Sequence, residues 1–422
     1  MANENTAAQI AAQPTPPPGS MQINVGEIAM RAEINGVSFG FDFNMGARVS
    51  VPEGKWRVRL IDRGTATLIH DQIMSGTTVA SKKRYFIPWR IEIMDEKGNL
   101  LFAHNYDAKG KKILFKNVSD ALGDTIAWIP YAREFMKKHG CEIYYAMNPA
   151  IAALLKHDYP EINFIGPDDR PPGIYASYYL GCFSPCHDRE CQPSSWHTLG
   201  LQRNVASILD LPRVEIRPTI TPTKKERLIK EPYVCIASQA SAQAKYWNNP
   251  VGWMDLNKFL HEQGYRVLCI DKERAYGAGY NPNRMPWGAE DFTGSYTLED
   301  RVNMLQYADF FVGLGSGLSW LAWAVGVPVV LISGFSLPEM EFDNPYRVIN
   351  YNVCTGCFND DAFDFEHGNF YWCPRNKDNK ERQFECTRGI TSMQVIETVK
   401  RLMKDFNLDP KNPNDKNKKK GK

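Results

Sequence analysis

The chain has 422 residues, 43% of them hydrophobic and 12% aromatic, which is enough to bury a sizeable core in two or three domains. Its 50 lysines and arginines nearly balance its 48 aspartates and glutamates, so the composition favours neither a basic nucleic-acid binder nor an acidic disordered chain. Residues 1–19 lack the basic and apolar regions of a signal peptide, so we expect a disordered arm on a soluble, cytoplasmic protein.

Residues 20–110 are predicted to form an all-β domain. The segments 56–62 (WRVRLID) and 90–95 (RIEIMD) alternate apolar and polar side chains, as half-buried strands do. The residues DEKGN then indicate a hairpin turn that leads into another strand, LLFAHNYD. We expect a small β-barrel or sandwich that supplies no catalytic group.

From about residue 111 strands alternate with helices, which indicates an α/β fold with parallel sheets. A first Rossmann-like domain, on the acceptor side, is expected over 111–215, and a second, for the nucleotide sugar, over 216–349. The expected strands are 111–118, 141–148, 162–166, 233–238, 265–271, 309–313 and 327–333, and the expected helices are 125–140, 149–160, 249–264, 297–308 and 316–326. Two such domains create a cleft, and ligands bind there at the carboxyl ends of the strands.

The uncharged stretch 310–338 is long enough to suggest a membrane span. Glycines and a proline interrupt it, which suits a strand, a turn, a helix and a second strand better than one continuous helix. We therefore expect no membrane span.

Four of the ten cysteines define a predicted metal-binding finger at 350–388. Cys354, Cys357, Cys373 and Cys386 follow the spacing C-x2-C-x15-C-x12-C in a segment with little apolar periodicity. Four thiolates suit a structural tetrahedral ion, and sulfur ligands alone do not distinguish zinc from iron. Four unrelated thiols are the alternative.

Neither the remaining C-terminal residues nor a second cysteine cluster is predicted to take part in catalysis. A closing helix is expected at 389–408 and a disordered basic tail at 409–422. Cys182, Cys186 and Cys191, with His187 beside them, match no sharp metal spacing, and we interpret them as ordinary loop thiols, with a metal site or a redox site as the alternatives.

A glycine-rich turn joins a strand to a helix in the second α/β domain. Gly315, Ser316 and Gly317 precede the helix, where backbone N–H groups and the helix dipole attract phosphate. Ser319 could add a hydroxyl, and the adjacent Leu318 is a further candidate for substrate binding. Alternatively, the glycines only permit close packing of strand and helix.

Lys245 lies in the loop after strand 233–238, at the carboxyl end of the second sheet. A lysine facing a pyrophosphate would offset the charge of a leaving nucleotide, and a solvated surface lysine is the alternative. Trp247 could stack on a base or fill the core. Asp271 could accept from ribose hydroxyls or merely end its strand. Gln243 is a neighbouring candidate for substrate binding.

Asp124 lies between the first strand and the first helix of the first Rossmann-like domain. A carboxylate at this edge of the cleft could take a proton from an acceptor hydroxyl, or it could cap the helix that we expect from Thr125, itself a candidate for substrate binding. Asp120 and Asp107 are the neighbouring alternatives.

Three strings resemble bacterial autotransporter heptosyltransferases, which are related to the lipopolysaccharide heptosyltransferases. They are LGDTIAWIP, SQASAQAKYWNNP and LGSGLSWLAWAVGVPVVLISGFSLPEMEF, followed by the four-cysteine segment. The resemblance covers roughly residues 20–405 and implies a GT-B fold with an added N-terminal β-domain and a C-terminal iron-binding finger. It also implies heptose transfer from ADP-heptose to serine hydroxyls of autotransporter adhesins, by a homo-oligomeric ring that is typically a dodecamer.

The resemblance also implies roles for particular residues. Asp124 matches the base, Lys245 the residue that faces the diphosphate, and 315–319 the phosphate-binding helix start. The metal ligands match Cys354, Cys357, Cys373 and Cys386, with iron favoured over zinc. We expect an inverting displacement that needs no divalent cation.

Parts of the chain depart from the family pattern. The proline-rich arm, the lysine-rich tail and the cluster around Cys182, which lies in the acceptor-side domain, are not family features. A same-fold enzyme that uses another nucleotide sugar or a glycan acceptor is one alternative function, and a non-enzymatic protein that binds through its metal knuckle is another.

Overall fold

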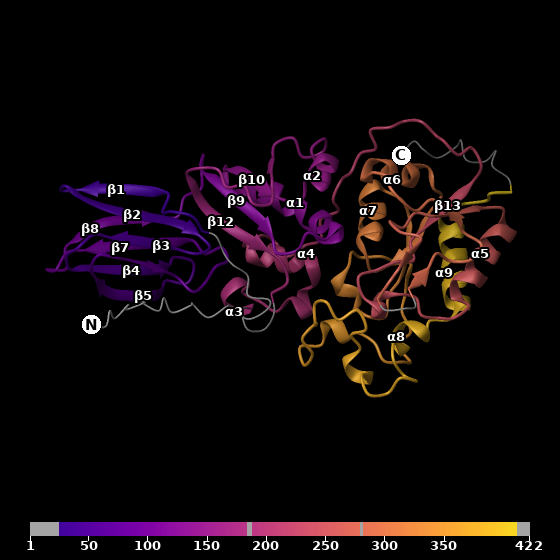
Figure 1. The fold of residues 1–422 in the computed structure, drawn as a ribbon. Coiled ribbons are helices and arrows are strands. Elements are labelled where there is room, and N and C mark those ends of the chain that lie inside the picture. Colours follow the sequence, from indigo (N-terminus) through magenta and orange to yellow (C-terminus); the bar gives the residue numbers. More distant parts are fainter. Residues whose placement is uncertain (1–24, 184–187, 279–281, 412–422) are drawn as a thin grey trace, which may run out of the picture.

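A computed structural model describes residues 25–183, 188–278 and 282–411. Figure 1 shows an N-terminal β-region, a first α/β domain and a second α/β domain following one another along the molecule. The segment between the last strand of the second domain and the final helix forms a separate lobe beneath that domain. No helix in the described ranges is long and apolar enough to cross a membrane.

The β-region consists of antiparallel strands in two layers. Its strands are β1 (Met30–Ile34), β2 (Val37–Asn44), β3 (Arg48–Val51), β4 (Trp56–Asp62), β5 (Thr67–Met74), β6 (Thr77–Ala80), β7 (Trp89–Met94) and β8 (Leu100–Asn105). One sheet has the order β5-β4-β7-β8, and its strands β4 and β7 bury alternate side chains as predicted. The other sheet contains β1, β2, β3 and β6 and extends beyond this region.

The β-region shares one of its two sheets with the first α/β domain. Strand β2 pairs in parallel with β12 (Ile174–Leu180), so one sheet runs β11-β10-β9-β12-β2-β3-β6. All seven residues of β12 are buried, and such a strand needs a partner on each side to satisfy its backbone groups. Because β9 supplies one partner, β2 supplies the other.

The first α/β domain has the predicted alternation of parallel strands and helices. Its elements are β9 (Lys112–Asn117), α1 (Leu122–His139), β10 (Glu142–Ala146), α2 (Pro149–Leu155), β11 (Asn163–Ile165), β12, α3 (Asp188–Cys191) and α4 (Trp196–Ile208). Strands β9, β10, β11 and β12 are parallel. The prediction lacked β12 and α4, although IYASYYL is a run of apolar and aromatic residues interrupted only by Ser177.

The second α/β domain has a parallel sheet in the order β17-β14-β13-β18-β19-β20. Its elements are β13 (Tyr233–Ile236), η1 (Gln243–Lys245), α5 (Gly252–Gln263), β14 (Arg266–Cys269), β15 (Ala275–Tyr276), β16 (Asn283–Arg284), β17 (Glu290–Asp291), α6 (Leu298–Tyr307), β18 (Phe311–Leu314), α7 (Gly317–Val325), β19 (Val329–Ile332), η2 (Pro338–Met340) and β20 (Arg347–Val348). The uncharged stretch 310–338 is thus divided among β18, α7 and β19, whose strands are fully buried.

The finger, residues 350–388, folds with only short helical turns before α9 closes the chain against the second domain. These elements are η3 (Cys357–Asn359), η4 (Pro374–Asn376), α8 (Glu385–Arg388) and α9 (Ser392–Asp405). Trp372 of the finger and Phe335 of the second domain are both buried in a small core that the two parts share.

The two α/β domains meet where α1 crosses α7. A Cβ added to Gly317 would lie 3.0 Å from Cβ of Leu122 and 3.1 Å from the backbone N of Gly123, closer than side chains normally approach. A Cβ on Gly123 would in turn lie 3.0 Å from Cδ1 of Trp320. The two glycines therefore let the N-termini of two helices from different domains come together.

Candidate active site

A cavity of 1260 Å³ lies where the two α/β domains and the finger meet. Ligand pockets typically measure about 300–1,000 Å³, so this one is large enough for a nucleotide sugar. Among the predicted site residues, the cavity is lined by Asp124, Lys245, Asp271, Gly315, Ser316, Gly317 and Leu318. Residues from both domains therefore face one space.

Asp124 lies in the first turn of α1, on the wall formed by the first domain. The helix begins at Leu122 with Ala121 as its N-cap residue and has no side-chain cap, so the N-cap alternative for Asp124 is wrong. Burial raises the pKa of the Asp124 carboxyl above its ordinary value, while a hydrogen bond from Ser119 and the charge of Lys245 act in the opposite direction. A half-buried carboxylate with a raised pKa has the properties of a general base.

Lys245 ends the short helix η1 and is half-buried in the cavity wall, so it is not a solvated surface lysine. Its Nζ lies 5.5 Å from the centre of the Phe335 ring and 5.9 Å from that of Phe358. Burial lowers the pKa of Lys245, and the carboxylates of Asp124 and Glu341 counteract this. The Lys245 ammonium is therefore placed on the cavity wall, where an anionic ligand would find a positive charge.

The start of α7 opens onto the same cavity without a side-chain cap. Uncapped N–H groups at a helix start attract phosphate, so the phosphate interpretation and the close-packing interpretation of this turn are compatible. Ser319 differs from the expectation because its buried Oγ donates to the carbonyl of Leu314 at 2.5 Å. Its hydroxyl therefore stabilises the turn between β18 and α7.

Three predicted substrate-binding residues lie behind the cavity wall. Trp247 is 4% exposed, and its indole N–H donates to the carbonyl of Ile390 at 2.9 Å, so this side chain fills the core. Thr125 donates to the carbonyl of Ala121 at 3.1 Å within α1. Gln243 donates to the side chain of Asn248 at 2.6 Å.

Asp271 lines the cavity, but its carboxylate already has partners. It accepts from the backbone N and the Oγ of Ser238, both at 2.8 Å, and from the backbone N of Gln239 at 3.2 Å. These bonds fix the loop that follows β13. Asp271 thus holds this strand-end loop, and its role toward a ribose stays a prediction.

The finger and η2 supply cavity residues that the sequence did not indicate. They are Met340, Glu341, Phe358, Asp364, Phe365 and His367. His367 is exposed at the cavity, and its charge lowers the pKa of Asp124. No local motif could have indicated these residues, because only the tertiary fold brings the finger across the cavity from α1.

Two members of the second cysteine cluster, Cys182 and Cys191, also line the cavity. Burial raises the pKa of the Cys182 thiol well above its ordinary value, and the nearby Asp124 carboxylate adds to this. A buried neutral thiol beside a carboxylate is a poor nucleophile. Cys186 and His187 lie outside the described residues.

The four finger cysteines are reduced and close together, although their side chains do not form a preassembled site. No group of three or more Cys, His, Asp or Glu residues in the described ranges is arranged to hold a metal ion, so the structure does not confirm the predicted ligand set. Burial and the neighbouring thiols of Cys354 and Cys373 raise the pKa of Cys357 to about 12, and the same causes raise that of Cys386 to about 12. Four clustered sulfur donors fit a thiolate-binding ion chemically, because a bound cation would stabilise the charged thiolates.

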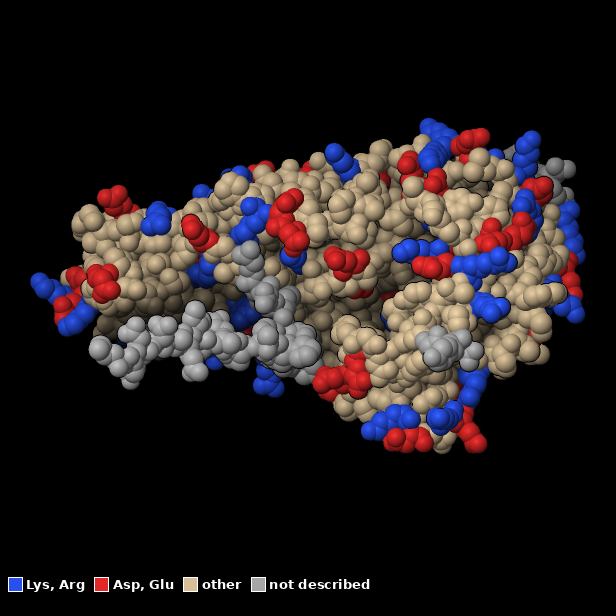
Figure 2. All heavy atoms as spheres, in the orientation of Figure 1, with Lys and Arg blue, Asp and Glu red and all other residues tan. Residues whose placement is uncertain are grey.

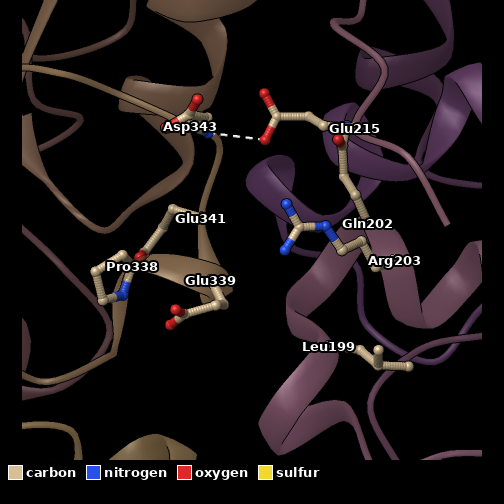
Figure 3. A pocket seen from close by; sticks show the side chains of 8 residues that line it. All are labelled: Leu199, Gln202, Arg203, Glu215, Pro338, Glu339, Glu341 and Asp343. Carbon is tan, nitrogen blue, oxygen red and sulfur yellow. Dashed lines mark hydrogen bonds between the residues drawn. The ribbon is translucent and has the colours of Figure 1, made fainter.

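A second cavity of 160 Å³ lies at the boundary of the two domains (Figure 3). The backbone N of Asp343 donates across it to Oε2 of Glu215 at 2.7 Å. Burial raises the pKa of Glu215, and the charge of Arg203 opposes this shift. The cavity is too small for a nucleotide sugar and forms part of the domain contact.

Two family models match the chain. The model for the N-terminal domain of glycosyltransferase TibC matches residues 35–97, and that for glycosyltransferase family 9 (heptosyltransferase) matches residues 199–357. Autotransporter heptosyltransferase BAHTCr of Citrobacter rodentium (strain ICC168) is 45% identical over 86% of this chain and 88% of its own length. The chain belongs to the autotransporter heptosyltransferase family. It is thus a glycosyltransferase of the family 9 type.

The structural comparison agrees with this assignment. The crystal structure of dodecameric iron-containing heptosyltransferase TibC in complex with ADP-D-beta-D-heptose has a TM-score of 0.86 and 41% identity, covering 90% of this chain and 99% of that one. The predicted GT-B-like fold with its added N-terminal domain is therefore confirmed. One relative at 38% identity, over 86% of this chain and 85% of its own length, is the inactive autotransporter heptosyltransferase BimC of Burkholderia thailandensis (strain ATCC 700388 / DSM 13276 / CCUG 48851 / CIP 106301 / E264).

Proposed function

We propose that the chain transfers heptose from ADP-heptose to serine hydroxyls of an autotransporter adhesin. The observation that carries the proposal is that Asp124, Lys245 and the start of α7 line one cavity. A relative of similar structure binds ADP-D-beta-D-heptose, which supports the donor. The family name of the relatives supports an autotransporter acceptor.

The reaction is a single displacement that inverts the anomeric carbon. The serine hydroxyl attacks that carbon and loses its proton to the Asp124 carboxylate, while the bond from the carbon to the diphosphate oxygen breaks. The raised pKa of Asp124 supports this role, because a base accepts a proton better when its conjugate acid is weaker.

The leaving ADP takes both electrons of the broken bond and gains negative charge. Lys245 and the uncapped N–H groups of α7 provide positive potential on the cavity wall where that charge would develop. These groups make a catalytic divalent cation unnecessary.

The finger cysteines Cys354, Cys357, Cys373 and Cys386 would hold one iron ion, which serves as a structural staple. The dodecameric iron-containing relative supports both this metal and a homo-oligomer, for which we propose a ring, and we propose that the enzyme acts in the cytoplasm. Lysines, arginines and acidic residues are interspersed on the face shown in Figure 2, so a nucleic-acid partner receives no support from the described part of this face.

The experiment combines purified protein, ADP-heptose and an autotransporter passenger fragment, with ADP release as the readout. Release that requires the fragment and is unchanged by added Mg²⁺ supports the proposal, as does loss of the sugar by alkaline β-elimination from serine. An absolute requirement for Mg²⁺ would contradict the metal-free mechanism. Normal ADP-heptose binding without ADP release would favour a non-catalytic binding protein.

A further inference from the structure

The finger contacts both α/β domains through the two residues that directly follow Cys357. The first contact is Asn359, which is 9% exposed. Its Nδ2 donates to the carbonyl of His197 in α4 at 2.8 Å, and its Oδ1 accepts from the backbone N of Leu337 at 2.8 Å. One side-chain amide thus joins the first domain, the second domain and the finger.

The second contact is Phe358, which lines the large cavity. Its ring centre lies 5.0 Å from that of Trp196 in the first domain and 4.9 Å from that of Phe335 in the second, on which it stacks. Its backbone N also donates to the carbonyl of Phe335 at 3.2 Å. The ring is therefore packed between side chains of both domains.

Lys245 lies over this same aromatic surface. Its Nζ is within 6 Å of the centres of both Phe335 and Phe358, the range of a cation–π contact. The ammonium makes no ion pair with any residue in the described ranges, and burial disfavours its charge. The charges of Asp124 and Glu341 favour the ammonium form, and the two rings are the side chains that the ammonium contacts directly, which leaves its N–H groups available to a ligand.

We propose that Phe358 is a positioning residue for the transfer reaction: it places the Lys245 ammonium for the donor diphosphate, and Asn359 fixes Phe358 between the domains. Both residues directly follow Cys357, so a folded finger fixes their positions. The folding of the finger therefore determines where the Lys245 ammonium lies in the donor site. The finger then contributes to donor binding as well as to stability. This inference rests on the proposed role of Lys245.

The test measures ADP affinity, with the thermal midpoint and metal content of each variant as controls for folding. Phe358→Leu removes the aromatic face and should weaken ADP binding by about 3- to 30-fold, as expected for a partly buried cation–π contact. Phe358→Tyr keeps the aromatic face and should retain the affinity. The matched control is Phe363→Leu, since Phe363 packs in the same finger core but does not line the cavity.

A double-mutant cycle with Lys245→Met separates positioning from general damage. If Phe358 acts through Lys245, then Phe358→Leu has no further effect on ADP affinity in the Lys245→Met background. An equal loss in both backgrounds would overturn the inference, as would equal losses of affinity in Phe358→Leu and Phe363→Leu. If Phe358→Leu does not fold, Phe358→Met, which has a more adaptable side chain, replaces it in the same cycle.

The same experiment distinguishes failure of the underlying function. If Lys245→Met binds ADP as tightly as the wild type, the proposed role of Lys245 is wrong, and the inference about Phe358 is then wrong as well. If Lys245→Met weakens ADP binding while Phe358→Leu has no effect, the role of Lys245 stands and only the inference about Phe358 is wrong.

Discussion

Asp124 and Lys245 come from different domains, line the same cavity, and each changes the pKa of the other. Neither forms an ion pair with any residue that the structure describes. Burial raises the pKa of the carboxyl and lowers that of the ammonium, so both groups are partly deprived of solvent. A base and a cation held apart in one cavity suit a reaction that removes a proton at one point and builds negative charge at another.

The pH dependence of transfer should report the pKa of Asp124. Because burial raises this pKa, we expect the acidic limb of kcat/KM to have its inflection above about 3.9, the ordinary value for aspartate. Activity falls as the pH drops through the inflection, since the protonated carboxyl cannot act as a base. Circular dichroism and ADP binding over the same range exclude unfolding and donor loss. An inflection at or below the ordinary aspartate value would contradict the assignment.

Replacing Asp124 should not lower stability at neutral pH. A pKa raised above that of the unfolded chain means that the ionised carboxylate is less stable in the fold. The stability linked to this group is fully present below the unfolded pKa and is lost as the pH rises through the folded pKa. The thermal midpoint of Asp124→Asn should therefore equal or exceed that of the wild type at pH 7. A clearly lower midpoint would indicate that the charged carboxylate stabilises the fold.

Metal retention should depend on the finger cysteines rather than on cysteines in general. Cys357→Ser is expected to reduce the bound iron by more than about tenfold, measured per chain by elemental analysis, because a ligand matters at least as much as its supporting hydrogen bonds. The thermal midpoint should fall as well. Cys141→Ser is the matched control, because Cys141 is equally buried at 7% exposure but lies outside the finger. Equal iron in both variants would refute the proposed ligand set.

The contact between α1 and α7 should not tolerate a larger residue at Gly317. The Cβ of Gly317→Ala would press on Leu122 and on the backbone of Gly123, so the start of α1 must give by a few tenths of an ångström. Overpacking of this kind costs about 1–3 kcal/mol, which denaturant unfolding can measure. Since the start of α7 also lines the cavity, ADP affinity should weaken together with stability. Wild-type values for both quantities would show that the contact is more adaptable than its geometry indicates.

The sequence was most informative where chemistry follows local structure. Lys245 and residues 315–317 each follow a parallel strand, so their placement on one cavity could be predicted from the order of elements. Trp247 and Ser319 belong to the same motifs but point away from the cavity, because side-chain direction depends on packing that the sequence pattern does not define.

Long-range contacts account for what the sequence did not predict. Strand β12 is an apolar run whose pairing with β2 joins residues far apart in the chain, so the predicted domain boundary near residue 110 does not separate two sheets. Phe358 and His367 lie in a finger without periodicity, and only the folded chain brings them to the cavity. Their residue types alone carried no signal.

The central claim is that this cavity transfers heptose to protein serines with Asp124 as the base. The most direct test is the intact mass of an autotransporter passenger fragment that is co-expressed with the wild-type chain or with Asp124→Asn. We expect a ladder of heptose-sized increments with the wild type, and a rate at least about 10²-fold lower with the variant, which should still bind ADP. An equally modified fragment with Asp124→Asn, or no increment with a folded, metal-loaded wild-type protein supplied with ADP-heptose, would contradict the account.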